Sequence, residues 1–351
     1  MVGRGLLAEL PRLLAERCPA HAYAVVADSR VAELYGARVL ATLREAGLVA
    51  GLFTFPAGEW NKTRESWAEL TDALLRARVG RDGAVLALGG GVTGDLAGFV
   101  AATYLRGVPW AQLPTTLLAM IDASIGGKTG VDLPAGKNLV GAFHQPRLVL
   151  ADIETLATLP RPHVAAGMAE AVKHAVVADA GLLDAVLSDS AAIRAKDLEA
   201  LERTVARASA VKEQVVATDP LEAGRRQVLN FGHTVGHAVE VRTGFALLHG
   251  EAIAIGMVAE SLLAESIGVA ERGLAAAVRA ALGRFDLPVS IPEDVASEDL
   301  VELMRVDKKA RAASLRFALP SALGAVRQHE DGAWTVEVDA AAIKLALDSC
   351  R

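Results

Sequence analysis

Residues 84–99 read AVLALGGGVTGDLAGF, and this stretch decides the fold class of the N-terminal half. Its apolar first part is typical of a strand buried in a parallel sheet. The glycines at 89–91 permit a tight turn, and the residues after them predict a helix that begins near Thr93 or Asp95. Such a turn brings backbone N–H groups and a helix N-terminus close to a bound pyrophosphate. Tight turns also need glycine for conformational reasons alone, so nucleotide binding is one of two interpretations.

On both sides of this stretch, strand and helix patterns alternate. Between residues 22 and 155, short apolar runs such as AYAVVAD (22–28) are separated by helical patterns such as SWAELTDALLRARV (66–79). This alternation predicts a parallel sheet covered by helices. Beyond residue 160 the periodicity is helical, and TLPRP (158–162) breaks the pattern between the two halves. We therefore predict an α/β domain over residues 1–158 and a mainly α-helical domain over residues 159–351, with the active site in a cleft between them.

Composition and charge argue against several classes of protein. A chain of 351 residues, with 52% hydrophobic and 22% charged residues, is long enough for two cores. Its net charge of −6 and the lack of a Lys/Arg run argue against a nucleic-acid partner. Cys18 and Cys350 form no disulfide framework, which favours the cytoplasm. Apolar stretches such as AIAIGMVAE (252–260) are too short to span a membrane, and the first residues do not read as a signal peptide.

Histidines and a carboxylate gather in the helical half. NFGHTVGH (230–237) places His233 and His237 on one face of a helix, and His249 begins the next helical pattern. GMAEAVKH (167–174) puts Glu170 and Lys173 on one face of another helix. Two histidines with one carboxylate are typical of catalytic zinc. Spacing alone lets either His233 or His237 bind the metal beside His249 and Glu170. A core histidine and a solvated Glu–Lys pair are the structural alternatives.

A central run, PTTLLAMIDASIGGKTGVDLPAGKNLVGAFHQP (114–146), carries lysines among glycines. Glycine loops with lysines suit phosphate binding, because the loop adds backbone donors to the ammonium charges. An exposed loop with solvated lysines is the alternative. Further cations lie near these motifs: Arg106, Lys212, Arg226, Lys308 and Lys309. Together they suit a substrate with a carboxylate and a phosphate. Asp28, and Glu59 with Lys62, are candidates for contacts with an adenosine ribose or diphosphate.

The motifs occur in the order found in a known family. The central run, together with GGGVTGDLAGFVAATYLRG (89–107), TLPRPHVAAGMAEAVKH (158–174), NFGHTVGHAVE (230–240), HGEAIAIGM (249–257) and DKK before RFALP (316–320), resembles 3-dehydroquinate synthase. The resemblance implies an N-terminal Rossmann-like NAD-binding domain, a C-terminal helical metal-binding domain and a homodimer. The implied reaction is a lyase step of the shikimate pathway to aromatic amino acids. It converts 3-deoxy-D-arabino-heptulosonate 7-phosphate to 3-dehydroquinate and phosphate through transient NAD oxidation, phosphate elimination, reduction and aldol closure.

The resemblance also implies roles for individual residues. Zn or Co would be bound by Glu170, His233 and His249. The catalytic residues implied beside the metal are Lys173, His237, Asp122 and Asn230, with His237 as a hydrogen-bonding or proton-relay residue. The substrate-binding residues implied are Arg106 (reaching across the dimer), Lys128, Asn138 and one lysine of Lys308 and Lys309 for the phosphate, and Lys212 and Arg226 for the carboxylate. The NAD-binding residues implied are Asp28, Glu59, Lys62, Gly90, Gly91, Asp95, Thr115, Thr116, Lys137 and Thr158.

Other functions stay open at this point. A related sugar phosphate cyclase, of the amino-dehydroquinate or epi-valiolone synthase type, would share most of these motifs. A polyol or glycerol-phosphate dehydrogenase of similar build would release NADH on each turnover, and the lysine-rich central run disfavours it. A non-catalytic protein that binds a metal and a nucleotide is the third class.

Overall fold

The computed structural model describes residues 1–134, 136–307, 315–329 and 331–351. The chain forms two compact units, Met1–Leu159 and Pro160–Arg351. The sequence prediction put the boundary at 158/159, and Pro160 and Pro162 flank the first residue of the helix that opens the second unit. Within the described ranges, no helix is both long and apolar enough to cross a membrane. Lys308 and Lys309, which the resemblance assigns to phosphate binding, lie outside these ranges.

A parallel sheet forms the centre of the first unit. Its strand order is β3-β2-β4-β5-β8, and each neighbouring pair is parallel. The strands are β2 (Ala22–Asp28), β3 (Val49–Phe55), β4 (Ala84–Gly89), β5 (Trp110–Pro114) and β8 (Leu148–Val149). The strand β4 is buried along its whole length, as its uninterrupted apolar sequence predicts. The predicted α/β architecture is confirmed.

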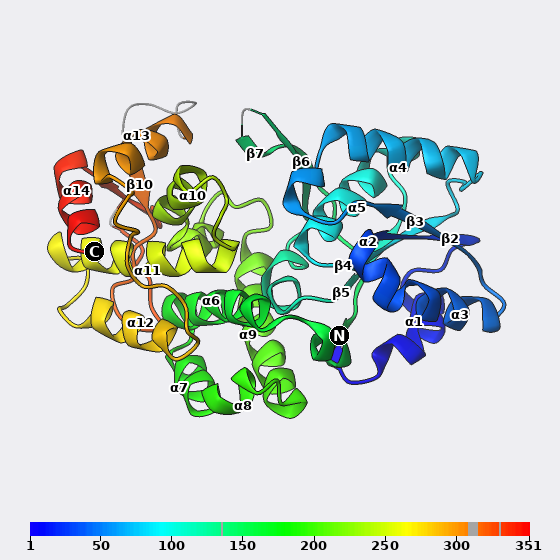
Figure 1. Cartoon of the computed structure of the whole chain (residues 1–351), viewed down its shortest axis with the longest axis horizontal. Helices are drawn as coiled ribbons and strands as arrows, with labels where there is room; N and C mark the ends of the chain where they lie inside the picture. The colour runs from blue at the N-terminus through cyan, green and yellow to red at the C-terminus, as the bar shows by residue number, and fades with distance from the viewer. Residues whose placement is uncertain (135, 308–314, 330) are drawn as a thin grey trace. The chain divides into compact units, whose positions relative to one another are not determined.

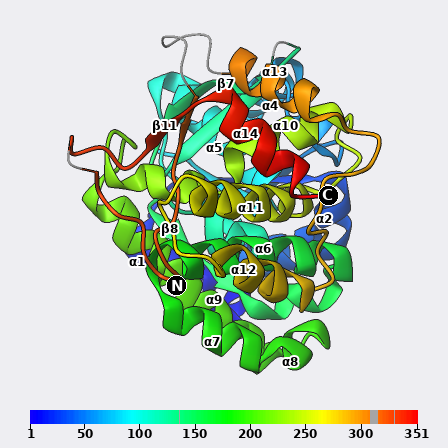
Figure 2. The same cartoon turned by 90° about the vertical axis from the view of Figure 1, so that its left-hand side faces the viewer.

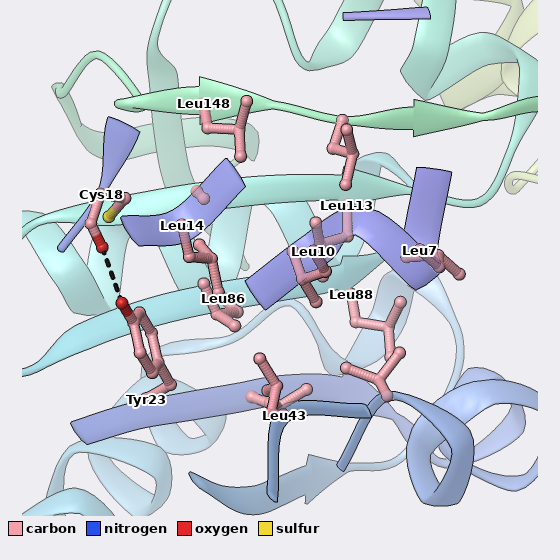
Figure 3. Packing of buried hydrophobic residues seen from close by; sticks show 14 of the residues in the cluster. Leu7, Leu10, Leu14, Cys18, Tyr23, Leu43, Leu86, Leu88, Leu113 and Leu148 are labelled. Carbon is pink, nitrogen blue, oxygen red and sulfur yellow. Dashed lines mark hydrogen bonds between the residues drawn. The ribbon is translucent and has the colours of Figure 1, made fainter. Parts of the chain in front are cut away.

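Helices cover both faces of this sheet (Figure 1). They are α1 (Leu10–Arg17), α2 (Ser29–Val31), α3 (Ala37–Glu45), α4 (Arg64–Arg76) and α5 (Gly91–Thr103). Leu86 and Leu88 of β4 point into the core beneath α1 and α3, where they meet leucines such as Leu10 and Leu43 (Figure 3). Val85 and Ala87 point into the opposite core, beneath α4 and α5. The alternation follows from the two-residue period of a strand.

The helix after the glycine turn begins at Gly91, earlier than the predicted Thr93 or Asp95. Glycines extend into the helix because its neighbours lie too close for side chains. A Cβ at Gly94 would come within 2.8 Å of the Gln112 side chain, and one at Gly98 within 2.7 Å of Trp110. The need for close packing therefore outweighs the weak helix propensity of glycine.

The central run is folded rather than a loop, which corrects the sequence prediction. Its lysines lie on an antiparallel hairpin of β6 (Lys128–Leu133) and β7 (Gly136–Phe143). Thr129 and Val131 are buried, and β6 packs against α5. A second small pairing joins β1 (Val2–Gly3) to β9 (Ala151–Asp152), and the Asp152 carboxylate accepts hydrogen bonds from the backbone of Gly5 and Leu7.

The second unit is mainly helical, as predicted. Its helices are α6 (Arg161–Ala178), α7 (Ala180–Ser188), α8 (Ser190–Arg194), α9 (Leu198–Thr218), α10 (His233–Arg242), α11 (His249–Ser266), α12 (Leu274–Gly283), α13 (Ser297–Asp307) and α14 (Ala340–Asp348). The helix α11 contacts α6, α10, α12 and α14, and Figure 2 shows it beside α6 and α12. Two short strands of this unit pair as β10 (Leu315–Phe317) and β11 (Val336–Val338).

Candidate functional site

Three side chains from three helices of the second unit converge. Glu170 lies in the middle of α6, while His233 and His249 are the first residues of α10 and α11. The Nε2 atoms of both histidines lie 3.7 Å from Oε1 of Glu170. One donor atom from each of the three residues lies within 4.8 Å of the other two. The structure therefore brings together the three residues that the resemblance assigns to the metal.

Glycines let α10 and α11 approach closely enough to place both histidines at one point. A Cβ at Gly256 of α11 would lie 2.0 Å from the carbonyl oxygen of Gly232, and one at Gly236 would lie 2.7 Å from Ile253. Gly232 also has φ 79°, a left-handed conformation that favours glycine at the turn before α10. The backbones of the two helices are thus in direct contact.

Hydrogen bonds fix which nitrogen each histidine offers. Nδ1 of His233 lies 3.1 Å from the carbonyl oxygen of Phe231, which can only accept, so Nδ1 carries the hydrogen and Nε2 keeps its lone pair. Nδ1 of His249 lies 3.3 Å from Oε1 of the buried Glu240. A carboxylate or carbonyl behind a ligand histidine is the usual arrangement at protein metal sites.

The donor set fits a divalent metal ion. Two ligands that each lie about 2.0–2.2 Å from one tetrahedral ion are separated by roughly 3.3–3.6 Å, and the observed 3.7 Å is close to that range. Oε2 of Glu170 forms an ion pair with Lys173, so Oε1 faces the histidines. Glu170 is fully buried, so its charge has to be balanced by nearby cations, of which Lys173 is one. The charge and geometry of these groups suit Zn²⁺ or Co²⁺.

The protons on the two histidines also differ. Burial, together with the nearby charge of Lys173, lowers the pKa of His233 well below its ordinary value, so its ring is neutral. Burial lowers the pKa of His249 as well, but Glu170 and Glu240 more than offset this and raise it to about 10. The His249 ring thus lies between two carboxylates, with Nδ1 toward Glu240 and Nε2 toward Glu170.

His237 lies beside this group. Its ring centroid is 5.3 Å from that of His233 and 5.9 Å from that of His249. The atoms of His237, Glu240 and His249 are also close enough to hold an ion. The tautomer of His233 favours the set with Glu170, since its Nε2 is the atom that faces the carboxylate. The role of His237 as a proton relay stays a prediction.

The remaining candidates of the second unit lie near one short helical segment, Arg225–Asn230. It packs against α6 and α9, and α9 carries the buried Lys212. Arg226 is 2% exposed, and its Nη1 donates to the carbonyl of Pro220. Asn230 donates from Nδ2 to Oε1 of Glu222 at 2.8 Å. Two buried cations on elements that pack against each other suit an anion, and their role in substrate binding stays a prediction.

In the first unit, the candidates for nucleotide binding lie at the carboxyl ends of neighbouring strands. Asp28 ends β2, Gly90 and Gly91 follow β4, and Thr115 follows β5. The chain order reverses between β2 and β4, and ligands of open α/β sheets bind at such a switch point. The hydroxyl of Thr93 lies 3.3 Å from Oδ2 of Asp28, so the two strand ends are in contact.

Lys62 is the centre of a second cluster in this unit. Its buried Nζ lies 3.2 Å from Asp95, 3.3 Å from Glu59 and 3.4 Å from Asp132, and it donates to Oδ1 of Asn138 at 2.7 Å. Burial raises the pKa of Asp95 to about 6, because Lys62 offsets only part of that effect. Lys62, Glu59 and Asp95, which are predicted to bind NAD, therefore lie in one hydrogen-bonded cluster with Asn138, which is predicted to bind phosphate.

Other predicted residues of the first unit are more scattered. Lys137 pairs with Glu59 at 3.5 Å, whereas Lys128 is exposed at the start of β6. The hydroxyl of Thr158 lies 2.7 Å from that of Tyr35. The hydroxyl of Thr116 accepts a hydrogen bond from the backbone N–H of Ala119. Asp122 lies in the short helix Ala119–Ala123. Arg106 lines a cavity of about 580 Å³ with His144 and Arg147.

Comparison with known proteins assigns the chain to a family. The family models for the 3-dehydroquinate synthase N-terminal and C-terminal domains match residues 52–166 and 167–310. A protein named 3-dehydroquinate synthase from Symbiobacterium thermophilum is 48% identical over 100% of this chain and 97% of its own length. The chain belongs to the 3-dehydroquinate synthase family. The resemblance found in the sequence is confirmed.

Two solved structures similar to this 3-dehydroquinate synthase family member are sugar phosphate cyclases. A 2-deoxy-scyllo-inosose synthase complexed with carbaglucose-6-phosphate, NAD⁺ and Co²⁺ has a TM-score of 0.92 at 26% identity, over 99% of this chain and 96% of that one. A 2-epi-5-epi-valiolone synthase from Streptomyces hygroscopicus, with NAD⁺ and Zn²⁺ bound, has a TM-score of 0.88 at 31% identity, over 99% and 95%. The fold prediction is therefore confirmed over the whole architecture.

The sequence interpretation missed several residues around the candidate site of this 3-dehydroquinate synthase family member. Glu240 and Glu260 are buried beside the candidate histidines His249 and His233, and Asp132 and Glu222 contact predicted site residues. One signal was available for Glu260, which is a charged residue in the apolar run AIAIGMVAESLL. A buried carboxylate needs partners, so such a position predicts a specific contact.

Proposed function

We propose that this chain catalyses the 3-dehydroquinate synthase reaction, the conversion of 3-deoxy-D-arabino-heptulosonate 7-phosphate to 3-dehydroquinate and phosphate. The proposal is carried by one observation. Glu170, His233 and His249 converge in a chain whose similarity to a 3-dehydroquinate synthase extends over its full length. A related cyclase would need a different substrate, and the identity to the named relative, 48%, exceeds that to either structural neighbour.

Both NAD and one divalent metal are part of the proposal, and the enzyme is then a carbon–oxygen lyase. Support comes from the two structural neighbours, which carry NAD⁺ together with Co²⁺ or Zn²⁺. The metal would be held by Glu170, His233 and His249, and NAD by the turn at Gly90 with Asp28 and its neighbours. When bound, the metal supplies Lewis acidity for a substrate hydroxyl and NAD accepts and returns a hydride.

The chain's own groups position the substrate and hold protons. Lys173 keeps a positive charge at Oε2 of Glu170, which leaves Oε1 for the metal. His237 is exposed beside the metal-binding rings, where its imidazole can accept or return a proton of a bound hydroxyl. Lys212 and Arg226 would bind the substrate carboxylate. Buried charges of this kind are pre-oriented, so they favour a developing negative charge without rearranging.

Several parts of the proposal concern the assembly. Arg106 is exposed on the surface of the first unit. In a homodimer it would bind the phosphate of the substrate that the partner subunit holds. Lys128 and Asn138 of the hairpin would bind the phosphate of the chain's own substrate. We also propose that the enzyme acts in the cytoplasm, where the pathway to aromatic amino acids would supply its substrate.

One assay tests the proposed function. The purified chain is incubated with Co²⁺ or Zn²⁺, NAD and the heptulosonate phosphate, and both inorganic phosphate and NADH absorbance are followed. Release of phosphate with no net NADH is expected, because the hydride returns to the substrate. NADH formed in proportion to product would indicate a dehydrogenase instead. Turnover with sedoheptulose 7-phosphate but not with the heptulosonate would transfer the chain to the related cyclases.

A further inference from the structure

Glu260 of α11 is a buried carboxylate that reaches the beginning of α10. Its side chain is fully buried. Oε2 accepts a hydrogen bond from the backbone N–H of Gly232 at 2.7 Å, and Oε1 accepts one from Val235 at 3.0 Å. These two N–H groups belong to the first turn of α10, where a helix has no backbone acceptors of its own. Glu260 therefore holds the turn that carries His233.

The contact continues to the metal-binding atom through one peptide unit. The N–H of Gly232 and the carbonyl of Phe231 belong to the same planar peptide. The N–H donates to Glu260, while the carbonyl accepts from Nδ1 of His233 at 3.1 Å. The opposite side of that imidazole, Nε2, faces Glu170 at 3.7 Å. A rotation of this peptide would thus rotate the ring away from Glu170.

Charge gives Glu260 a second effect on the same centre. The N-terminus of a helix carries a partial positive charge, and α10 begins at a residue that is to bind a cation. The carboxylate of Glu260 lies against that N-terminus and offsets the positive charge. An anion that bonds to the N–H of a peptide also makes its carbonyl a stronger acceptor, which strengthens the bond to His233.

We propose that Glu260 is a positioning residue for the metal centre, which sets the orientation of His233 and thereby the metal affinity. This inference rests on the proposed function, because it takes His233 to be a metal ligand. Glu260 does not touch the metal or the substrate in this scheme. It acts through the peptide that joins Phe231 to Gly232.

The same helix offers a matched control. Glu265 of α11 accepts hydrogen bonds from the backbone of Gly273 at 3.0 Å and Ala275 at 2.8 Å, at the N-terminus of α12. It therefore makes the same kind of cap on a helix that begins with no histidine. A general loss of stability would follow from either substitution, whereas a change in the metal centre would follow only from the change at Glu260.

The experiment compares E260Q and E265Q with the unchanged chain. Apoprotein is titrated with Co²⁺ and with Zn²⁺ in competition with a chromophoric chelator, and the visible absorption of the Co²⁺ form is recorded. A glutamine at 260 places an NH₂ group against one of the two N–H donors. We expect E260Q to bind both ions about 10- to 100-fold more weakly, as at other outer carboxylates of metal sites, with altered Co²⁺ bands. E265Q should keep the affinity within about twofold and the same bands.

The outcomes separate the inference from the proposed function. An unchanged chain that binds neither ion would overturn the proposed metal centre, and with it the role of Glu260. If the unchanged chain binds the ions and E260Q binds them with the same affinity and Co²⁺ bands, only the role of Glu260 is overturned. A loss of metal affinity in E265Q equal to that in E260Q would overturn it as well. If E260Q does not fold, E260D is measured, whose shorter carboxylate cannot reach both N–H groups. A metal affinity of E260D below that of the unchanged chain supports the inference, and an unchanged metal affinity refutes it.

Discussion

Replacing Lys62 with methionine should destabilise the first unit, and the loss should depend on pH. Methionine keeps the length of the side chain but removes the ammonium group that faces Glu59, Asp95 and Asp132. Removing one partner of a buried ion pair costs about 3–5 kcal/mol. We expect about 3 kcal/mol, the lower end, because the carboxylate side chains are 17–38% exposed. For a unit of this size the melting temperature would fall by roughly 6–12 °C.

The sign of the pH dependence follows from Asp95. Its pKa is about 6 with Lys62 present, above the ordinary 3.8, chiefly because of burial. Without Lys62 the pKa rises further. A carboxyl group with a raised pKa costs nothing at low pH, where it is protonated in both states, and destabilises the folded state as the pH rises through that pKa. The difference in melting temperature between K62M and the unchanged chain should therefore be larger at pH 8 than at pH 5.

The assay is thermal unfolding at both pH values, without NAD or metal. Tryptophan fluorescence suits it, because Trp60, Trp67 and Trp110 lie in the first unit and only Trp334 in the second. K137M is the control, since Lys137 forms a partly exposed pair with Glu59, worth at most about 1 kcal/mol. Equal losses in both variants, or a loss in K62M that does not grow with pH, would refute the reasoning.

Three further predictions concern the second unit. H249A should lose its bound metal and its activity while the circular dichroism spectrum stays unchanged; a full metal content would contradict the ligand assignment. G256A should destabilise the unit by about 1–3 kcal/mol and lower the metal affinity, because its Cβ would meet the carbonyl of Gly232. G283A, whose Cβ would meet no atom within 4 Å, should change neither the melting temperature nor the metal affinity. Metal uptake near pH 7.5 should release about one proton from His249, so affinity should fall as the pH falls. Calorimetric heats that do not vary between buffers of different ionisation enthalpy would contradict this.

Much of the fold could be predicted because its patterns are local. The alternation of apolar runs and helical patterns predicted the parallel sheet, and β4 is as buried as its sequence suggests. The hairpin of residues 128–143 was missed because its glycines and lysines resemble a loop. What makes it a hairpin is the packing of Thr129 and Val131 beside α5, a contact between distant segments that spacing does not reveal.

The candidate metal ligands could be predicted in part. Spacing gave a set of histidines and carboxylates but could not choose between His233 and His237, which lie on one helix face. The structure favours His233, because its Nδ1 donates to a carbonyl and its Nε2 faces Glu170. The hydrogen bonds of Glu260 depend on how α10 packs on α11, so no local pattern predicts them. The roles of the substrate- and NAD-binding residues stay predictions.

The helix α11, which carries part of the proposed metal centre, lies in the part of the second unit that we expect to unfold last. It carries His249, the close contact at Gly256 and the carboxylate of Glu260, and it packs against α6, α10, α12 and α14. Helices with so many packed neighbours exchange their amide hydrogens only through large-scale unfolding. Local breathing of the surface helices would then leave both histidines in place. The geometry of the two histidines would then persist until the whole unit opens, so it depends on the kinetic stability of that unit.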